Sequence, residues 1–266
     1  MQYRKFTIEN GDGNTIALAE STSKIFLNNP TGLGINNTIT TNNYPDKMNV
    51  VNNEQSFGSI GGEMVFYDYI NKDKYQAYND FITFLMVKPL KLYYELPIPK
   101  TYSIDIDLLT IEKTEVKNDG LLRCNFTFQT LSRWKGETIK ITGSDNTYQI
   151  TNNGHMPVGF KITINSNGLN KPYIKLIQDN ILYGEAKITR SLVTTMYINS
   201  IDGENELNIN NLGGYSTNLQ DLSISNGSIY VTFMKIARGV STLEIGMDGG
   251  TIDSVEIEYT PLYRSV

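Results

Sequence analysis

Apolar and polar residues alternate along most of this chain, and a period of two predicts a protein made mainly of β-strands. In the first half, the alternation predicts strands over residues 3–8, 14–18, 59–69 and 90–96. Residues 28–53 are instead rich in Asn, Thr and Gly and contain Pro30 and Pro45. Such a composition favours a loop-rich stretch there, and an extended arm is the alternative.

One segment departs from the period of two. Residues 71–88 carry an apolar stripe at helical spacing, formed by Tyr75, Tyr78, Ile82 and Leu85. Asn71 or Asp73 can cap the first turn, because a short polar side chain can accept the unpaired N–H groups of a helix start. Lys88 suits the helix end, and Pro89 stops it. One helix cannot bury this stripe alone, so we expect it to pack on a sheet.

A long hairpin is expected over residues 104–130. Its apolar positions alternate with polar ones and comprise Ile104, Ile106, Leu108, Leu122, Cys124, Phe126 and Phe128. Asn118-Asp119-Gly120 lies between the two arms and is a strong turn signal. The pattern therefore predicts two antiparallel strands that share one apolar face.

The second half reads as nearly pure β-structure. Predicted strands cover residues 138–142, 158–164, 173–178, 185–190, 194–199, 206–210, 228–235, 241–247 and 255–259. Predicted turns separate them at residues 152–154, 167–168, 202–203, 226–227 and 248–250. Many short strands at this spacing predict a sandwich or jelly roll.

Composition divides the chain near Lys135-Gly136. Residues 1–134 hold 18 of the 28 aromatic residues, and the later sequence is richer in Asn, Gly, Thr, Ser and Ile. We therefore expect two domains, residues 1–134 and 135–266, although 266 residues are also compatible with one large domain.

Charge and cysteine content exclude several classes. A net charge of −5 argues against a nucleic-acid-binding protein, which needs a basic face to neutralise phosphates. Cys124 is the single cysteine, so no internal disulfide can form. The N-terminus lacks the apolar core of a signal peptide, and no window approaches the ~20 apolar residues of a membrane span. We expect a chain made in the cytoplasm, with no membrane partner.

Candidate catalytic and metal-binding residues are sparse. His155 is the only histidine, and no nucleophile motif accompanies it, so we expect an exposed loop residue. One His and one Cys are too few for a zinc site. Asp105 with Asp107, and the acidic turn at residues 202–206, do not match a calcium loop, and a solvated strand face or turn is favoured.

Two other features have structural explanations. The glycine-rich stretch 58–62 has no phosphate-loop ending, so a turn or bulge is favoured. Trp134 can belong to the core or a domain junction, and a sugar-stacking or interface role is the alternative. A glycosidase would need two paired carboxylates, which the sequence cannot place together. We expect no enzymatic activity and no cofactor.

Three stretches of the first half resemble the distal tail protein (Dit) family, the hubs at the tips of siphophage tails. They read FGSIGGEMVFYD, KYQAYNDFITFLMVKPLKLYYELP and DIDLLTIEKTEVKNDGLLRCNFTFQTLSRW, from residue 57 to residue 134. The resemblance is one of order and texture over about 130 residues, without a diagnostic short motif. In the second half, YVTFMKIARGVSTLEIG is similar to the family's galectin-like C-terminal sandwich.

The resemblance implies a mainly β protein of two domains. The first would be a ring-forming β-sandwich with one helix and a long hairpin, and the second a galectin-like β-sandwich. Six copies would form a ring in the virion, between the tail tube protein and the tail-associated tip protein. The second domains would project outward and carry receptor-binding proteins. Candidate ring contacts on the helix and hairpin are Tyr75, Tyr78, Ile82, Leu85, Ile104, Ile106, Phe126 and Phe128.

Several alternatives stay open. No inserted carbohydrate-binding module is evident in residues 135–266, which favours a plain hub. Residues 251–266 either close the second sandwich or return to the ring domain. The main rival function is a soluble carbohydrate-binding adhesin, and a glycan hydrolase with a β-sandwich is the third. Related hubs also occur in contractile particles, so the tail type is not decided.

Overall fold

A computed structural model of the chain describes residues 5–18, 24–34, 37–44, 47–55, 57–67, 73–96, 100–115, 120–189, 193–209, 214–216, 221–224 and 229–266. For residues 35–56 and 210–232 it describes strands but no side chains. The chain folds into two compact units, Met1–Gly136 with Tyr263–Val266, and Glu137–Leu262. The boundary after Gly136 lies two residues beyond the boundary after residue 134 that composition predicts. Of the final segment, β22 (Ile252–Tyr259) lies in the second unit, and the last four residues belong to the first.

The first unit is built on one nine-stranded sheet. Seven strands follow the order β2-β1-β7-β8-β9-β6-β3. Off this path, β10 pairs with β8, and β23 pairs with β10. The bounds are β1 Lys5–Glu9, β2 Thr15–Ala17, β3 Ile25–Thr31, β6 Ser59–Phe66, β7 Leu90–Glu95, β8 Thr101–Lys113, β9 Leu122–Thr130, β10 Trp134–Lys135 and β23 Leu262–Tyr263. The expected N-terminal β-sandwich is therefore wrong in one respect, because these strands form a single sheet.

This sheet curls so that its two edges meet. Leu18 follows β2, and its carbonyl accepts the N–H of Leu27 in β3 at 2.7 Å. Ile8 of β1 and Leu27 of β3, from opposite ends of the strand order, line the same small internal cavity. The single curled sheet thus encloses an apolar core between its own strands, as two stacked sheets do in a β-sandwich.

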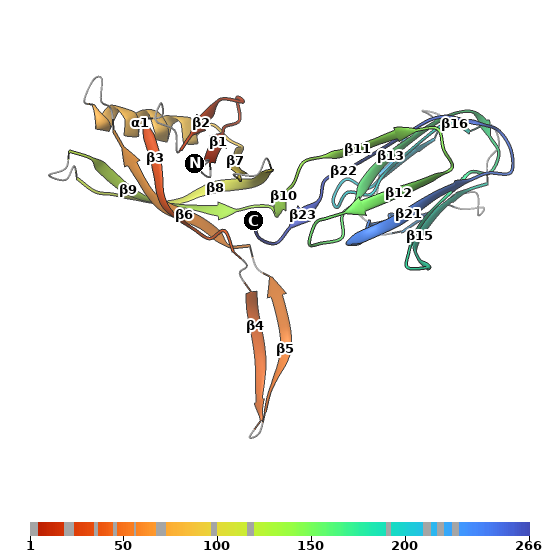
Figure 1. Ribbon diagram of the computed structural model, residues 1–266, viewed down its shortest axis with the longest axis horizontal. Helices are drawn as coiled ribbons and strands as arrows, with labels where there is room; N and C mark the ends of the chain where they lie inside the picture. The colour runs from red at the N-terminus through yellow and green to blue at the C-terminus, as the bar shows by residue number, and fades with distance from the viewer. Residues whose placement is uncertain are drawn as a thin grey trace. The chain divides into compact units, whose positions relative to one another are not determined.

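Helix α1 (Lys74–Leu85) lies across the sheet near β6 (Figure 1). The Asp73 carboxylate accepts the Gln76 N–H at 2.8 Å and so caps the first turn. The helix is shorter than the expected 71–88, and Asn71 lies outside the described residues. Its buried residues are Ala77, Phe81 and Leu85. Of the predicted stripe, only Leu85 is fully buried. Tyr78 and Ile82 are partly buried against the same core, and Tyr75 is exposed.

The expected hairpin is confirmed by the antiparallel pairing of β8 with β9. Its inner positions are buried in alternation, as the sequence pattern predicted. The register shifts by one residue at Leu109, which forms a β-bulge. Residues 116–119, with most of the predicted turn, lie outside the described part of the chain.

Strands β4 (Asn37–Tyr44) and β5 (Lys47–Gln55) form an antiparallel pair. No other described strand pairs with them. The stretch expected to be loop-rich, or an extended arm, is therefore mainly a β-hairpin.

Most of the glycine-rich stretch 58–62 lies within β6, which begins at Ser59, and is not a turn. A Cβ on Gly62 would come within 2.6 Å of Leu27 Cδ1 and 3.0 Å of the Asn28 carbonyl. Glycine thus allows β3 to approach β6 closely. The expected bulge lies opposite, where the β3–β6 register shifts between Asn28 and Thr31.

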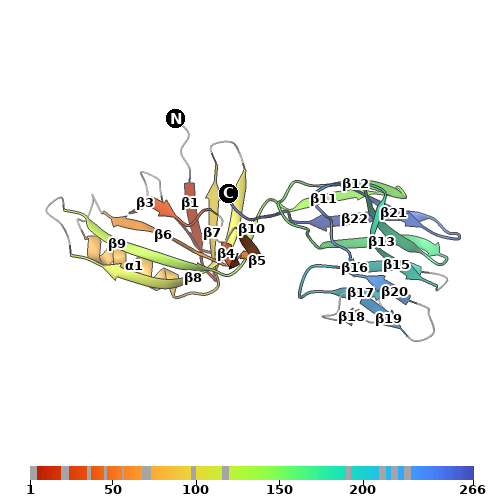
Figure 2. The ribbon, with the colours of Figure 1, turned by 90° about the horizontal axis from the view of Figure 1, so that it is seen from below.

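The second unit contains two six-stranded sheets, which appear as stacked layers in Figures 1 and 2. Their orders are β11-β22-β13-β16-β17-β18 and β12-β21-β14-β15-β20-β19. The bounds are β11 Ile139–Gly143, β12 Thr147–Asn152, β13 Phe160–Leu169, β14 Tyr173–Gln178, β15 Ile181–Ile188, β16 Val193–Asn199, β17 Glu206–Ile209, β18 Gly214–Ser216, β19 Asp221–Ile224, β20 Ile229–Thr232 and β21 Gly239–Gly246. One buried apolar cluster draws side chains from both sheets.

Some sequence predictions for this unit differ from the structure. Strands β12, β18 and β19 were not predicted. The turn expected at Asn167-Gly168 lies inside β13, where Gly168 has φ 74° and the pairing with β16 is irregular. Turn signals thus marked a distortion within a strand. The predicted turn at residues 226–227 lies outside the described part of the chain.

Candidate assembly surface

Five of the eight candidate contact residues are buried within the first unit. They are Leu85, Ile104, Ile106, Phe126 and Phe128. Phe126 shows their environment, because its ring centroid lies 5.5 Å from that of Phe81 on the helix and 6.2 Å from that of Phe66 on β6. These side chains hold the helix to the sheet.

The other three candidates lie nearer to solvent. Tyr78 and Ile82 are partly buried, and Tyr75 is 41% exposed. The Tyr75 hydroxyl donates to Glu115 Oε2 at 2.7 Å. Lys113 Nζ lies 5.1 Å from the Tyr75 ring centroid and 5.3 Å from that of Tyr78. These contacts fasten the far end of the hairpin to the first turn of α1.

Sequence reasoning missed the most exposed apolar residues of the sheet. Leu109, at the bulge in β8, is 55% exposed, and Leu131, directly after β9, is 56% exposed. The Leu131 N–H donates to the Asp105 carbonyl at 2.8 Å, which fixes its backbone. The pair Leu108-Leu109 could have indicated this exposed position, because two consecutive leucines interrupt the alternation of the strand.

Asp105 and Asp107 on β8 form ion pairs with lysines that lie outside the hairpin. Asp105 Oδ2 lies 2.6 Å from Lys135 Nζ. Burial raises the pKa of the Asp105 carboxyl, but Lys135 and Ser132 outweigh it, so that pKa is lowered. Asp107 forms an ion pair with Lys88, whose hydrogen bond lowers the pKa of the Asp107 carboxyl. The two aspartates thus occupy a solvated, ion-paired strand face.

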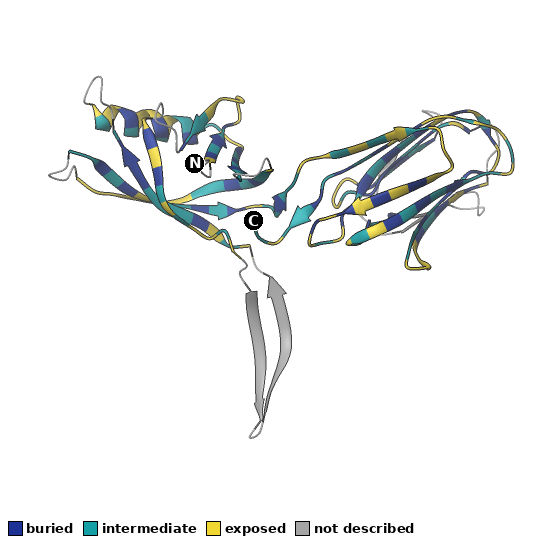
Figure 3. Cartoon of the chain, viewed as in Figure 1, coloured by how far each residue is buried: buried dark blue, intermediate teal, exposed yellow. Residues whose placement is uncertain are grey.

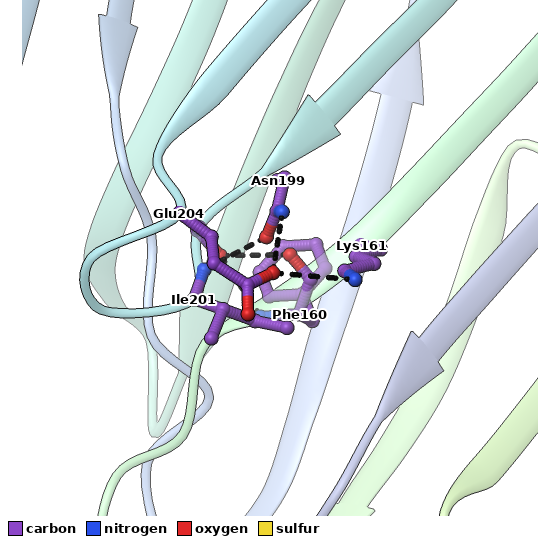
Figure 4. Close-up of polar contacts among 6 residues, drawn as sticks. Phe160, Lys161, Asn199, Ile201 and Glu204 are labelled. Carbon is purple, nitrogen blue, oxygen red and sulfur yellow. Dashed lines mark hydrogen bonds and ion pairs between the residues drawn. The ribbon is translucent and has the colours of Figure 1, made fainter. Parts of the chain in front are cut away.

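The acidic turn of the second unit, residues 202–206, also forms ion pairs with lysine side chains. Glu204 Oε2 lies 3.3 Å from Lys161 Nζ and accepts from Asn199 Nδ2 at 3.1 Å (Figure 4). Asp202 Oδ1 lies 2.6 Å from Lys235 Nζ. The lysine side chains offset the charge of both carboxylates, and these contacts hold the turn between β16 and β17.

The remaining candidate residues fit structural roles. His155 is exposed, and its backbone N–H donates to the Leu262 carbonyl at 2.7 Å. Trp134 is buried, with its ring centroid 6.2 Å from that of Tyr94. Within the described ranges, no three His, Cys, Asp or Glu residues are placed to hold a metal ion. The same ranges contain no helix long and apolar enough to cross a membrane.

Residues 5–131 match a family model described as the distal tail protein, N-terminal domain. No curated protein matches the sequence.

Solved structures share the fold along nearly the whole chain. The crystal structure of Dit from phage SPP1, described as a paradigm of the hub adsorption apparatus in phages that infect Gram-positive bacteria, has a TM-score of 0.70 at 10% identity. That match covers 96% of this chain and 98% of the SPP1 protein. A chain of the phage P2 baseplate, in its activated conformation with calcium, has a TM-score of 0.56 at 14% identity and covers 99% of this chain and 100% of its own length.

Proposed function

This chain belongs to the distal tail protein family through residues 5–131, and from that premise we propose that six copies form a ring-shaped hub at the tip of a phage tail. The ring joins the end of the tail tube to the tail-associated tip protein. The match of the sheet-and-helix unit to the family model is the observation that carries the proposal. The fold shared with SPP1 Dit and with a chain of the P2 baseplate supports it.

The ring contacts use the helix and hairpin side of the first unit. Of the eight expected contact residues, Tyr75 has the most exposed surface, and Leu109 and Leu131 add exposed apolar surface on the hairpin and just beyond it. The buried candidates act as a scaffold that fixes these positions. A head-to-tail contact repeated by rotation closes such a ring.

The second unit carries the host-adhesion apparatus. Its two sheets and shared core are compatible with a galectin-like sandwich, and receptor-binding proteins are the partners that a hub would hold there. The proposed role is structural. It requires no catalysis and no cofactor, and it involves neither nucleic acid nor membrane as a partner.

Light scattering after size exclusion, with negative-stain images of the same peak, tests the proposal. We expect a mass six times that of the 30.0 kDa chain and a six-fold ring. Adding the tail tube protein should produce rings if the free chain remains a monomer. A chain that stays monomeric with the tube protein present would overturn the hub proposal.

A carbohydrate-binding adhesin is the second candidate. Tyr197 on β16 pairs with Asn208 on β17, and Asn199 pairs with Glu206, so an aromatic ring lies among amides and a carboxylate. Such a group can stack on and hydrogen-bond a sugar. A glycan array with the full-length chain tests it. Binding that Tyr197→Ala abolishes supports this candidate, and an array without hits removes it.

A further inference from the structure

The hairpin of β14 and β15 ends in an apolar tip. Asp179 and Asn180 form its two-residue turn, with φ of 51° and 63°, which suits the twist of the flanking strands. The next three residues are exposed in succession: Ile181 by 61%, Leu182 by 49% and Tyr183 by 46%. Figure 3 shows this end of β15 in the colour of exposed residues. Three consecutive exposed apolar residues are unusual unless they have a function.

The same residues lie on an open sheet edge. On one side, β15 pairs with β14 from Ile181 to Lys187. On the other side it pairs with β20 only through Ala186–Ile188. Among the described strands, none pairs with residues 181–185 on that side. Main-chain N–H and C=O groups along such an edge can accept a further strand.

The core does not use these side chains. Inward positions on β15 begin at Gly184 and continue at Ala186 and Ile188, which are buried. Leu182 lies opposite Ile177, and the register shift that follows makes Tyr183 an extra residue. The edge strand β12 offers a contrast, because its exposed side chains are Thr147, Gln149 and Thr151. The β15 tip therefore lacks the polar cover that the other edge has.

We propose that residues 181–183 of β15 are a strand-addition site for an extended segment of another tail protein. The open edge supplies main-chain hydrogen bonds, and side chains on successive positions supply apolar contacts on both faces. An extended peptide fits this chemistry. This inference rests on the proposed function, since it assumes that the chain is part of a tail.

Charge disfavours a second copy of this chain as the occupant. An antiparallel pairing of two β15 edges centred on Leu182 would bring Asp179 of each copy opposite Glu185 of the other. Like charges directly opposite one another destabilise a strand pair. Glu185 is already ion-paired with Lys187 at 3.0 Å, so Asp179 is the carboxylate that favours a segment with an apolar centre and a basic residue on its flank.

Hydrogen–deuterium exchange tests the site. Amides of residues 181–184 should exchange at least about tenfold more slowly in purified tails than in the free full-length chain. Equal exchange rates in both would overturn the inference. Protection of these amides in the free chain that grows as the protein concentration rises would also overturn it. The occupant would then be a second copy of this chain.

A variant pair completes the test. Tails assembled with the Ile181→Lys, Leu182→Lys chain should lose one protein component and the protection, while those with Val240→Lys, another exposed apolar position, keep both. Loss in both variants, or in neither, would contradict the site. A chain absent from purified tails would instead refute the hub proposal, so the two failures are distinguishable.

Discussion

On the sheet of the first unit, Tyr93 and Glu9 form a hydrogen bond between a neutral and a charged side chain. The Tyr93 hydroxyl donates to Glu9 Oε2 at 2.9 Å, across the pairing of β7 with β1. Burial raises the pKa of Tyr93 first, and the Glu9 hydrogen bond and the charges of Glu9 and Asp105 raise it further, to about 12. The fold therefore favours the neutral tyrosine.

This shift has a consequence for stability at high pH. An unfolded tyrosine has a pKa of about 10, so the stabilisation is complete below that pH and is lost as the pH rises toward 12. We expect a steeper fall in the free energy of unfolding for the wild type than for Tyr93→Phe above pH ~10. Urea unfolding at several pH values measures it. Equal slopes for the two proteins would contradict the prediction.

At the scale of the element, the start of α1 depends on one carboxylate. Asp73 accepts the Gln76 N–H at 2.8 Å, and no acidic residue lies in the first turn to share this role. Asp73→Ala should lower the free energy of unfolding by about 1 kcal/mol, whereas Asp73→Asn, which keeps an acceptor, should cost less. Urea unfolding followed by Trp134 fluorescence measures both. Equal losses would show that the hydrogen-bond acceptor itself contributes nothing and that the effect comes from the carboxylate charge.

The helix also depends on Phe81, which is fully buried between α1 and the sheet. Its ring centroid lies 5.9 Å from that of Phe66 and 5.5 Å from that of Phe126. Phe81→Ala should cost about 3–5 kcal/mol, because the cavity cannot be filled by neighbouring side chains without disturbing the sheet. Met86→Ala, at an exposed position, is the control and should change the same unfolding free energy little. Similar losses in both would refute this role.

Elements were predictable from the sequence where local pattern decides them. The hairpin followed from strict alternation at positions such as Cys124 and Phe126, and the helix followed from its spacing and the Asp73 cap. The rotation of the helix did not follow, because Tyr75 and Phe81 are both apolar enough for a buried face. Only the partner surface, with Phe66 and Phe126, selects Phe81.

Longer-range features were less accessible. A single curled sheet instead of a sandwich depends on the contact of Leu18 with Leu27, which no periodicity encodes. Strand β15 begins at Ile181, four residues before the predicted start at residue 185, and Ile181, Leu182 and Tyr183 do not alternate with polar residues. That break in pattern is the signal of the proposed strand-addition site. For the candidate contacts, the sequence pattern did not tell which side chains of the helix and hairpin remain exposed.

At the scale of the whole molecule, each unit completes its own core. One apolar cluster belongs to the sheet and helix of the first unit, and another belongs to the two sheets of the second. Because the apolar faces of the hairpin and helix are buried within one chain, the proposed ring would have to use side chains outside them. Exposed residues such as Leu109 are therefore better candidates for the proposed contacts than buried ones such as Phe128.

Ring assembly should therefore be separable from folding. Leu109→Lys with Leu131→Lys places two ammonium groups where apolar contact is proposed, and burying an unpaired charge is costly. We expect a folded monomer with a thermal transition close to that of the wild type, and no six-fold ring by light scattering and negative-stain imaging. Val240→Lys, an equally exposed position in the second unit, should leave the ring intact. A ring that persists with both leucines replaced would exclude these two residues from the interface and place the contacts elsewhere on the first unit.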